Sequence, residues 1–105
     1  MKRGEVRWYT FKAPDKRRPV LILTRESAIG LLASVTVAPI TTTVRGIPAE
    51  LLLTDADGLP QTCAANFDNL QTVPKQNLGP RIATLSAEKM QLAGRAIAFA
   101  LEVDG

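Results

Sequence analysis

Apolar and polar positions along most of this chain follow the spacing expected of short β-strands. Glu5–Phe11 alternates about Val6, Trp8 and Thr10, which indicates a strand with two different faces. Pro19–Thr24 is nearly all apolar, as in a strand covered on both faces, and we expect its proline only at the strand's start. Four further strands are predicted from β-branched or apolar runs: Ser34–Thr43, Ala49–Thr54, Thr62–Phe67 and Arg81–Leu85.

The pattern changes to helical spacing after Ser86. Ser86 is a suitable helix N-cap, and Glu88 places negative charge in the first turn, where the helix dipole favours it. An apolar stripe then follows at helical spacing: Met90, Ala93, Ile97 and Leu101. Several short strands and one C-terminal helix predict a mainly β fold, a small and strongly bent sheet or open barrel with the helix packed on it.

Three connecting segments have weaker patterns. We expect Arg25–Leu32 to be irregular or briefly helical, and Leu70–Leu78 to be a connection with a single helical turn after Pro74. Asp55 and Asp57 precede a Gly-Leu-Pro run, so we interpret them as turn residues rather than metal ligands.

Length and composition limit the possible classes of protein. The 105 residues are enough for one domain, residues 1–105, and no apolar run approaches the length of a membrane span, so we expect no membrane partner. The N-terminus leads into a strand instead of an apolar signal core. A lone cysteine, Cys63, cannot form an internal disulfide, and we expect a cytoplasmic protein in which this thiol is a small buried hydrophobe.

Charge is distributed unevenly along the chain. Residues 1–45 carry nine Lys and Arg against three acidic side chains, a net charge of +6, whereas residues 46–105 carry four against seven, a net charge of −3. A basic half of a small domain suits a polyanionic partner, although a solvated basic face without a partner would have the same composition.

The chain has no histidine, which limits its chemistry. The usual zinc sites need several nitrogen or sulfur ligands, so we predict no metal and no cofactor. Acid–base catalysis by a pair of imidazoles is also excluded. Arg18 opens one predicted strand and Thr41 lies near the end of another, so a forked cation and a hydroxyl donor could face one phosphate at the rim of the sheet.

Six short motifs in order give the chain a resemblance to a known family, the MazF/PemK toxin endoribonucleases of bacterial toxin–antitoxin modules. The motifs are Arg3-Gly4-Glu5-Val6, Lys16-Arg17-Arg18-Pro19-Val20-Leu21, Val37-Ala38-Pro39-Ile40-Thr41, Ile47-Pro48-Ala49-Glu50-Leu51, Asp68-Asn69-Leu70-Gln71-Thr72-Val73 and Ile82-Ala83-Thr84-Leu85-Ser86. The resemblance implies an SH3-like β-barrel with a C-terminal helix. It also implies a homodimer that cuts single-stranded mRNA without a metal, leaves 2′,3′-cyclic phosphate and 5′-hydroxyl ends, and is blocked by a cognate antitoxin.

By position, the resemblance makes Arg18 and Thr41 the catalytic pair and places Asp68-Asn69 near the bound RNA. Asn69 stands where family members commonly have glutamine, and the first loop, Lys12–Arg17, is shorter than in many members. A flexible acidic antitoxin segment that competes for the basic groove is the expected inhibitor. The recognised RNA sequence and the group that accepts the 2′-proton are left unassigned.

Other residues are candidates for RNA binding. Four cations are candidate phosphate contacts along a groove: Lys12, Lys16, Arg17 and Arg25. Phe67 is a candidate for stacking on a base, and Trp8 a second one.

Two other functions remain open from the sequence. One is a gyrase-poisoning toxin of the same fold (CcdB-type), although the ending Glu102-Val103-Asp104-Gly105 lacks the aromatic residue expected there. The other is a non-catalytic SH3-like module that binds nucleic acid or peptide, for which the aromatic residues are few.

Overall fold

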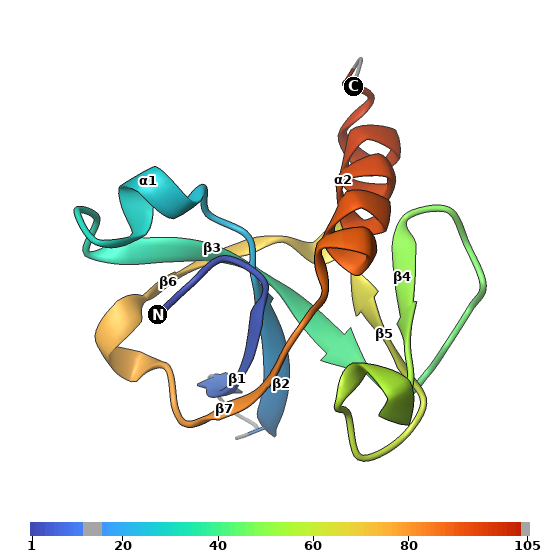
Figure 1. Ribbon diagram of the computed structural model, residues 1–105, viewed down its shortest axis with the longest axis horizontal. Helices are drawn as coiled ribbons and strands as arrows, with labels where there is room; N and C mark the ends of the chain where they lie inside the picture. The colour runs from blue at the N-terminus through green and yellow to red at the C-terminus, as the bar shows by residue number, and fades with distance from the viewer. Residues whose placement is uncertain (12–15, 104–105) are drawn as a thin grey trace.

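The computed structural model describes residues 1–11 and 16–103, with Lys16 described by its backbone alone. In this part of the chain seven strands form one antiparallel sheet in the order β4-β5-β3-β2-β1-β7, with β6 paired to β3 (Figure 1). The strands are β1 (Glu5–Phe11), β2 (Lys16–Ile22), β3 (Ser34–Thr41), β4 (Glu50–Leu53), β5 (Cys63–Asn66), β6 (Gln71–Pro74) and β7 (Arg81–Thr84). The sheet curls into a half-barrel beside a C-terminal helix, which confirms the predicted fold class.

The helices also follow local sequence signals. The C-terminal helix α2 (Ala87–Leu101) begins after Ser86, whose hydroxyl accepts a hydrogen bond from the Lys89 backbone N–H at 3.1 Å, so the predicted N-cap is confirmed. The short helix α1 (Glu26–Ile29) lies in the segment expected to be briefly helical. Three single turns of 3₁₀-helix complete the list: η1 (Asp55–Asp57), η2 (Phe67–Asn69) and η3 (Lys75–Asn77).

Strand β3 produces the curl because its partners change along its length. One edge of β3 pairs with β6 over Ser34–Val37 and then with β5 at Ile40 and Thr41, so β5 and β6 diverge from a shared neighbour. Strand β6 was expected to be a connection. Only Val73 of its four residues is buried, and a strand with one buried residue and a terminal proline has too little periodicity to be predicted.

The core occupies both faces of the two central strands. Leu21 joins the cluster beneath α2, whereas Val20 and Ile22 join a second cluster with Val35 and Val37, which confirms that β2 is covered on both faces. Pro19, in contrast, lies within β2 and not at its start, opposite Trp8 of β1. Pairing of β2 with β3 covers only Val20–Ile22, so the proline lies just where β2 loses one neighbour, a position that tolerates a missing N–H.

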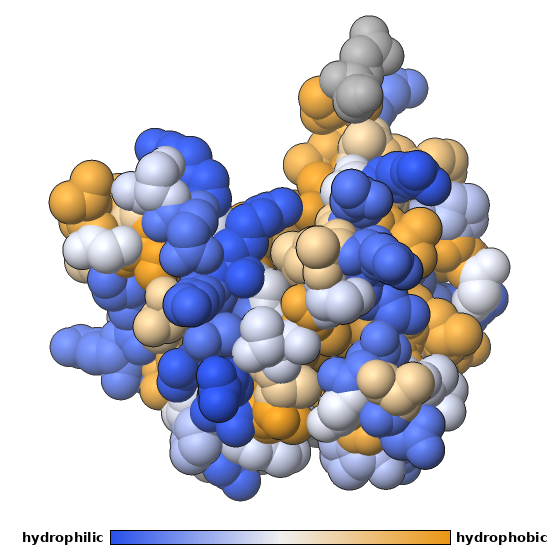
Figure 2. All heavy atoms as spheres, in the orientation of Figure 1, coloured by the Kyte–Doolittle hydropathy of each residue, from blue (hydrophilic) through white to orange (hydrophobic). Residues whose placement is uncertain are grey.

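One side of α2 packs on the sheet and the other leaves apolar residues exposed. Ala93 and Ala96 are buried, but Leu101 of the predicted stripe is 54% exposed. Leu92, Phe99 and Val103 are also exposed, and Figure 2 shows hydrophobic residues along this helix. Within the residues described, no helix is both long and apolar enough to cross a membrane.

Candidate active site

Arg18 and Thr41 lie across from each other at the place where pairing of β2 with β3 ends. The last pairs are Leu21 with Ala38 and Val20 with Pro39. Continuing this antiparallel register by two residues brings Arg18 opposite Thr41. Both side chains are partly exposed, and the sheet therefore places a guanidinium and a hydroxyl on neighbouring strands at an accessible edge.

Two pockets contain both residues. The first, of about 370 Å³, we call the Trp8 pocket: it runs from Arg18 and Thr41 to Trp8 on β1, with Leu59, Gln61 and Cys63 opposite. The second, of about 190 Å³, we call the Asn69 pocket, because Asn69, Asn66 and Arg45 complete it.

A third hollow extends the site in one direction. It has a volume of about 460 Å³, and Arg18 and Asn69 line it together with Phe11, Asp68 and Gln71. Arg18 thus borders all three adjoining hollows.

The Thr41 hydroxyl is oriented by its own loop. Its oxygen accepts a hydrogen bond from the Thr43 backbone N–H at 3.1 Å. This bond uses an oxygen lone pair and leaves the hydroxyl hydrogen to be donated. Thr41 can therefore donate to a phosphate oxygen beside Arg18.

Two polar residues on β4 and β5 fix the segments on either side of the pair. Glu50 accepts a hydrogen bond from the Arg45 backbone N–H at 3.0 Å, which holds the loop after β3. Asn66, which is buried, accepts one from the Asp68 backbone N–H at 2.9 Å, which holds η2. Glu50 also has a buried oxygen, Oε2, without a hydrogen-bond partner among the described residues.

The structure brings together some of the predicted RNA-binding residues. Arg17, Asp68 and Asn69 line the hollows around Arg18. Lys12 lies outside the described residues, as does the side chain of Lys16.

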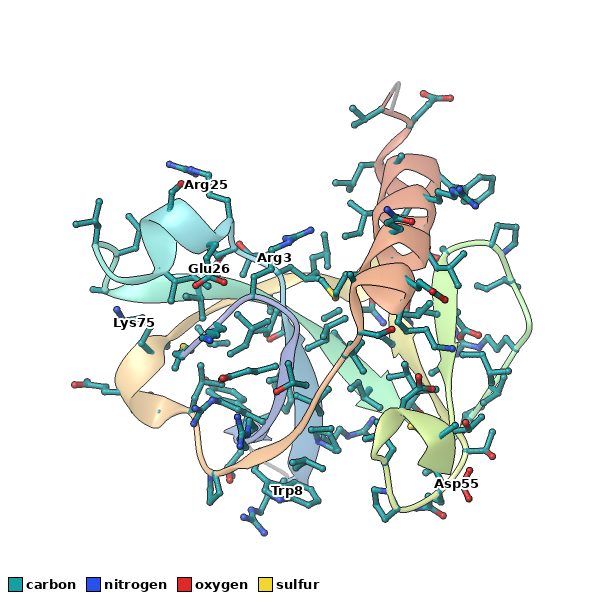
Figure 3. The ribbon with its side chains drawn as sticks, viewed as in Figure 1. Arg3, Trp8, Arg25, Glu26, Asp55 and Lys75 are labelled. Atoms are coloured by element: carbon teal, nitrogen blue, oxygen red, sulfur yellow. The ribbon has the colours of Figure 1, made fainter. Side chains whose placement is uncertain are left out.

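Two of the predicted residues do not lie at these hollows. Arg25 follows the other end of β2 and lines a separate hollow near α2, so it is remote from the Arg18 pockets; Figure 3 shows Arg25 and Trp8 at opposite ends of the molecule. Phe67 is only 1% exposed, because its ring fills the core beneath α2, and it has no free face on which a base could stack. The aromatic residues that border the hollows around Arg18 are Trp8 and Phe11.

Sequence reasoning missed Arg45 and Gln61. Arg45 lies in an irregular segment, and the loop after β3 brings it back to Thr41. Gln61 reaches the Trp8 pocket from the turn that follows η1. The only signal for Arg45 was its basic side chain four residues after Thr41, and Gln61 had none.

The remaining chemically active groups have structural roles. Cys63 is buried, as predicted; desolvation, with a smaller contribution from the charge of Asp57, raises the pKa of its thiol and makes it a poor nucleophile. Asp57 accepts a hydrogen bond from the Thr54 backbone N–H at 2.9 Å, as a turn residue would. Among the described residues, no cluster of three or more acidic, histidine or cysteine side chains is placed to hold a metal ion.

Comparisons with known proteins agree with this geometry. Residues 2–101 match the family model described as PemK-like, MazF-like toxin of type II toxin-antitoxin system. Endoribonuclease MazF3 of Mycobacterium tuberculosis is 47% identical over 90 residues, which cover 86% of this chain and 87% of that protein. The probable endoribonuclease MazF5 of the same organism is 41% identical over 102 residues, covering 96% and 89% of the two chains.

Solved structures give the same result. The Mycobacterium tuberculosis toxin MazF-mt6 superposes with a TM-score of 0.88 at 40% identity, covering 96% of this chain and 99% of that one. A mycobacterial endoribonuclease in complex with its cognate antitoxin also superposes with a TM-score of 0.88, at 27% identity, covering 100% and 98% of the two chains. The chain therefore belongs to the PemK-like, MazF-like toxins of type II toxin–antitoxin systems.

Proposed function

We propose that this MazF-type endoribonuclease toxin cuts single-stranded mRNA at selected sequences, without a metal, and that Arg18 and Thr41 bind the phosphate that is cut. Family membership and 47% identity to an endoribonuclease support the class of enzyme. The observation that carries the residue assignment is the position of Arg18 opposite Thr41, with both side chains in the same two pockets.

The reaction we propose uses the RNA's own 2′-hydroxyl. The 2′-oxygen loses its proton and forms a bond to phosphorus, the bond from phosphorus to the 5′-oxygen breaks, and that oxygen takes up a proton. The products are a 2′,3′-cyclic phosphate and a 5′-hydroxyl. The transient phosphorane carries additional negative charge on its non-bridging oxygens.

Each residue of the pair has one part in this reaction. The planar guanidinium fork of Arg18 can bind two phosphorane oxygens. Thr41 adds a neutral hydrogen bond to the same group. Donors held in place before the reaction stabilise developing charge best, and pairing of Arg18 with β1 and of Thr41 with β5 holds both backbones in place.

We further propose that the toxin acts as a homodimer and is inhibited by a flexible acidic segment of a cognate antitoxin. A solved relative forms a complex with its antitoxin, which supports the second part. For the dimer, one exposed apolar side of α2 offers Leu92 and Phe99, seven residues apart, to the same surface of a second copy. Sedimentation of the wild type and of Phe99→Asp tests this: a dimer that the variant converts to a folded monomer is expected, and a monomeric wild type would contradict the proposal.

Incubation with single-stranded RNA in excess EDTA tests the reaction, with the ends of the products analysed chemically. Cyclic phosphate ends are expected. Intact RNA in the presence of folded protein would instead support a toxin that poisons gyrase or a binding module, and cleavage that EDTA abolishes would refute metal independence.

Matched variants of Thr41 test the assignment of residues. Thr41→Val keeps the β-branched shape but removes the hydroxyl, whereas Thr41→Ser keeps the hydroxyl. We expect Ser to retain most of the kcat and Val to lose it; equal activity of the two variants would show that the hydroxyl has no part in the reaction.

A further inference from the structure

The Trp8 pocket is larger than the contact with one phosphate requires. Its volume of about 370 Å³ lies within the range of small-molecule sites. Its inner wall is apolar, formed by Ile40, Leu59 and Cys63, whereas Arg17 and Gln61 give it a polar rim. Because Arg18 and Thr41 border it, a group attached to the bound phosphate would enter this space.

Trp8 is held firmly at one side of the pocket by the segment behind it. Its carbonyl accepts a hydrogen bond from the Gly79 backbone N–H at 2.8 Å, and its own N–H donates to the Pro80 carbonyl at 3.2 Å. A Cβ on Gly79 would lie 3.3 Å from the Trp8 Cβ, so the backbone approaches as closely as it does only because this residue is glycine.

A partly buried ion pair holds that segment in turn. Arg7 donates to the Gly79 carbonyl at 3.0 Å and pairs with Glu5 at 2.8 Å. Glu5 is only 4% exposed. The backbone that carries the indole is therefore fixed before any ligand arrives, which reduces the entropy that binding costs.

The side chain above the indole is itself a stacking group. The Arg17 guanidinium carbon lies 4.4 Å from the centroid of the Trp8 ring, in a cation–π arrangement. Indole rings and guanidinium planes are both surfaces on which unpaired bases of RNA stack. The pocket thus offers two planar groups of the kind that bind a nucleobase.

We propose that the Trp8 pocket is a nucleobase subsite: it takes the base next to the phosphate held by Arg18 and Thr41, stacks it on Trp8 and Arg17, and reads its edge with Gln61. The amide of Gln61 can both donate and accept hydrogen bonds, as reading a base edge requires. This subsite rests on the proposed nuclease function, because the bound phosphate anchors the base. It gives the enzyme a physical basis for selecting one nucleotide at the cut.

The fluorescence of Trp8 tests the subsite without any cleavage. The chain has one tryptophan, so fluorescence excited at the long-wavelength edge of indole absorption, where tyrosine and nucleotides do not absorb, reports on this pocket. We expect at least one of the four nucleoside 5′-monophosphates to quench it, and ribose 5-phosphate, which has the phosphate but no base, to leave it unchanged. If no nucleotide changes the signal, or if ribose 5-phosphate changes it equally, the subsite is refuted.

Two substitutions at Trp8 separate stacking from packing. Trp8→Phe keeps an aromatic ring, whereas Trp8→Leu keeps only apolar volume. Since stacking one base on an aromatic residue contributes about 1–3 kcal/mol, we expect Leu to raise the KM for RNA at least about five-fold with a smaller effect on kcat, and Phe to restore most of the affinity. Equal KM values for folded Phe and Leu variants would contradict stacking.

Gln61→Ala tests the reading of the base edge. We expect it to reduce the differences in affinity among the four monophosphates; unchanged differences would remove Gln61 from the proposal. Failure of the subsite is distinguishable from failure of the nuclease function: quenching without RNA cleavage would support the pocket and refute the nuclease, and cleavage without quenching would do the reverse.

Discussion

Glu50 and Asn66 face each other across β4 and β5, and each holds a different backbone segment beside the Arg18–Thr41 pair. Glu50 binds the Arg45 N–H and Asn66 binds the Asp68 N–H. Both residues can affect RNA binding through these segments without contacting RNA themselves. Their positions mean that one cross-strand pair keeps the two sides of the Asn69 pocket at a fixed separation.

Asn66→Ala should therefore weaken both the fold and RNA binding. Loss of the capping oxygen at η2 should lower the free energy of unfolding by about 1 kcal/mol and raise the KM for RNA, because Asp68 and Asn69 are no longer held. Asn66→Ser keeps a capping oxygen and should recover part of both losses. Urea unfolding and steady-state kinetics provide the measurements, and an Ala variant with lower stability but unchanged KM would show that η2 does not position the RNA.

Arg18→Ala should abolish cleavage while leaving the fold intact. Removing a preorganised donor to a charged transition state typically costs about 10²–10³ in kcat, and Arg18 is a partly exposed residue at the edge of the pockets. Arg18→Lys keeps the charge without the fork and should have intermediate activity. Single-turnover cleavage and circular dichroism measure the two properties; an unfolded Ala variant would mean that the residue is structural.

Arg45 and Arg25 form a matched pair for salt dependence, because only Arg45 lies beside Arg18. Arg45→Ala keeps the backbone N–H that binds Glu50, so the loop should remain in place. Loss of one phosphate contact should reduce the slope of log K against log salt by ~0.7, whereas Arg25→Ala should leave the slope unchanged. Binding of uncleavable single-stranded DNA at several salt concentrations measures this, and equal slopes for wild type and Arg45→Ala would exclude a phosphate contact.

Acid should weaken the fold through Glu5. Burial raises the pKa of this carboxyl, but the hydrogen bond from Arg7, a backbone hydrogen bond at Lys2 and the Arg7 charge together outweigh burial, so the pKa is lowered from its ordinary 4.5. A lowered pKa means that the stabilisation is complete above pH 4.5 and is lost as the pH falls through the folded-state pKa.

Glu5→Gln should lower the free energy of unfolding at neutral pH by roughly 1.5–3 kcal/mol, the usual range for a hydrogen bond to a charged group. It should also flatten the decline in stability below pH 4.5. Urea unfolding at a series of pH values measures both. A variant that loses stability in acid as steeply as the wild type would show that other carboxyls dominate.

The predictability of this molecule differs between strands and loops. β1, β3 and α2 have strong periodic patterns that predict them, but β2 begins at Lys16, three residues before the predicted strand, so Arg18 lies inside it. Whether β2 and β3 are adjacent, and in which register, depends on pairing between residues far apart in the chain, which local periodicity does not encode.

The differences between the expected and the observed positions of other site residues have the same origin. Phe67 follows a predicted strand and directly precedes Asp68-Asn69, so its place in the sequence suggests a residue beside the site. In the structure α2 covers it, and the residues of α2 lie 20 or more positions further along the chain. Arg45 and Gln61 reach the pockets through irregular loops, whose paths depend on individual hydrogen bonds such as that between Glu50 and Arg45. Arg25 comes after β2, the strand that contains Arg18. It lies beyond the opposite end of that strand from Arg18.

The central position of β3 in the sheet has a consequence for how the toxin can be inhibited. β3 is paired with β2, β5 and β6, so its amide hydrogens should be among the slowest to exchange with deuterium, and Thr41 is its last residue. Partial melting of the periphery, such as fraying of α1 or of the exposed end of α2, would leave this strand intact. Partial unfolding at the periphery therefore should not inactivate the toxin. An inhibitor must either cover the pockets around Arg18 or act on the fully unfolded chain.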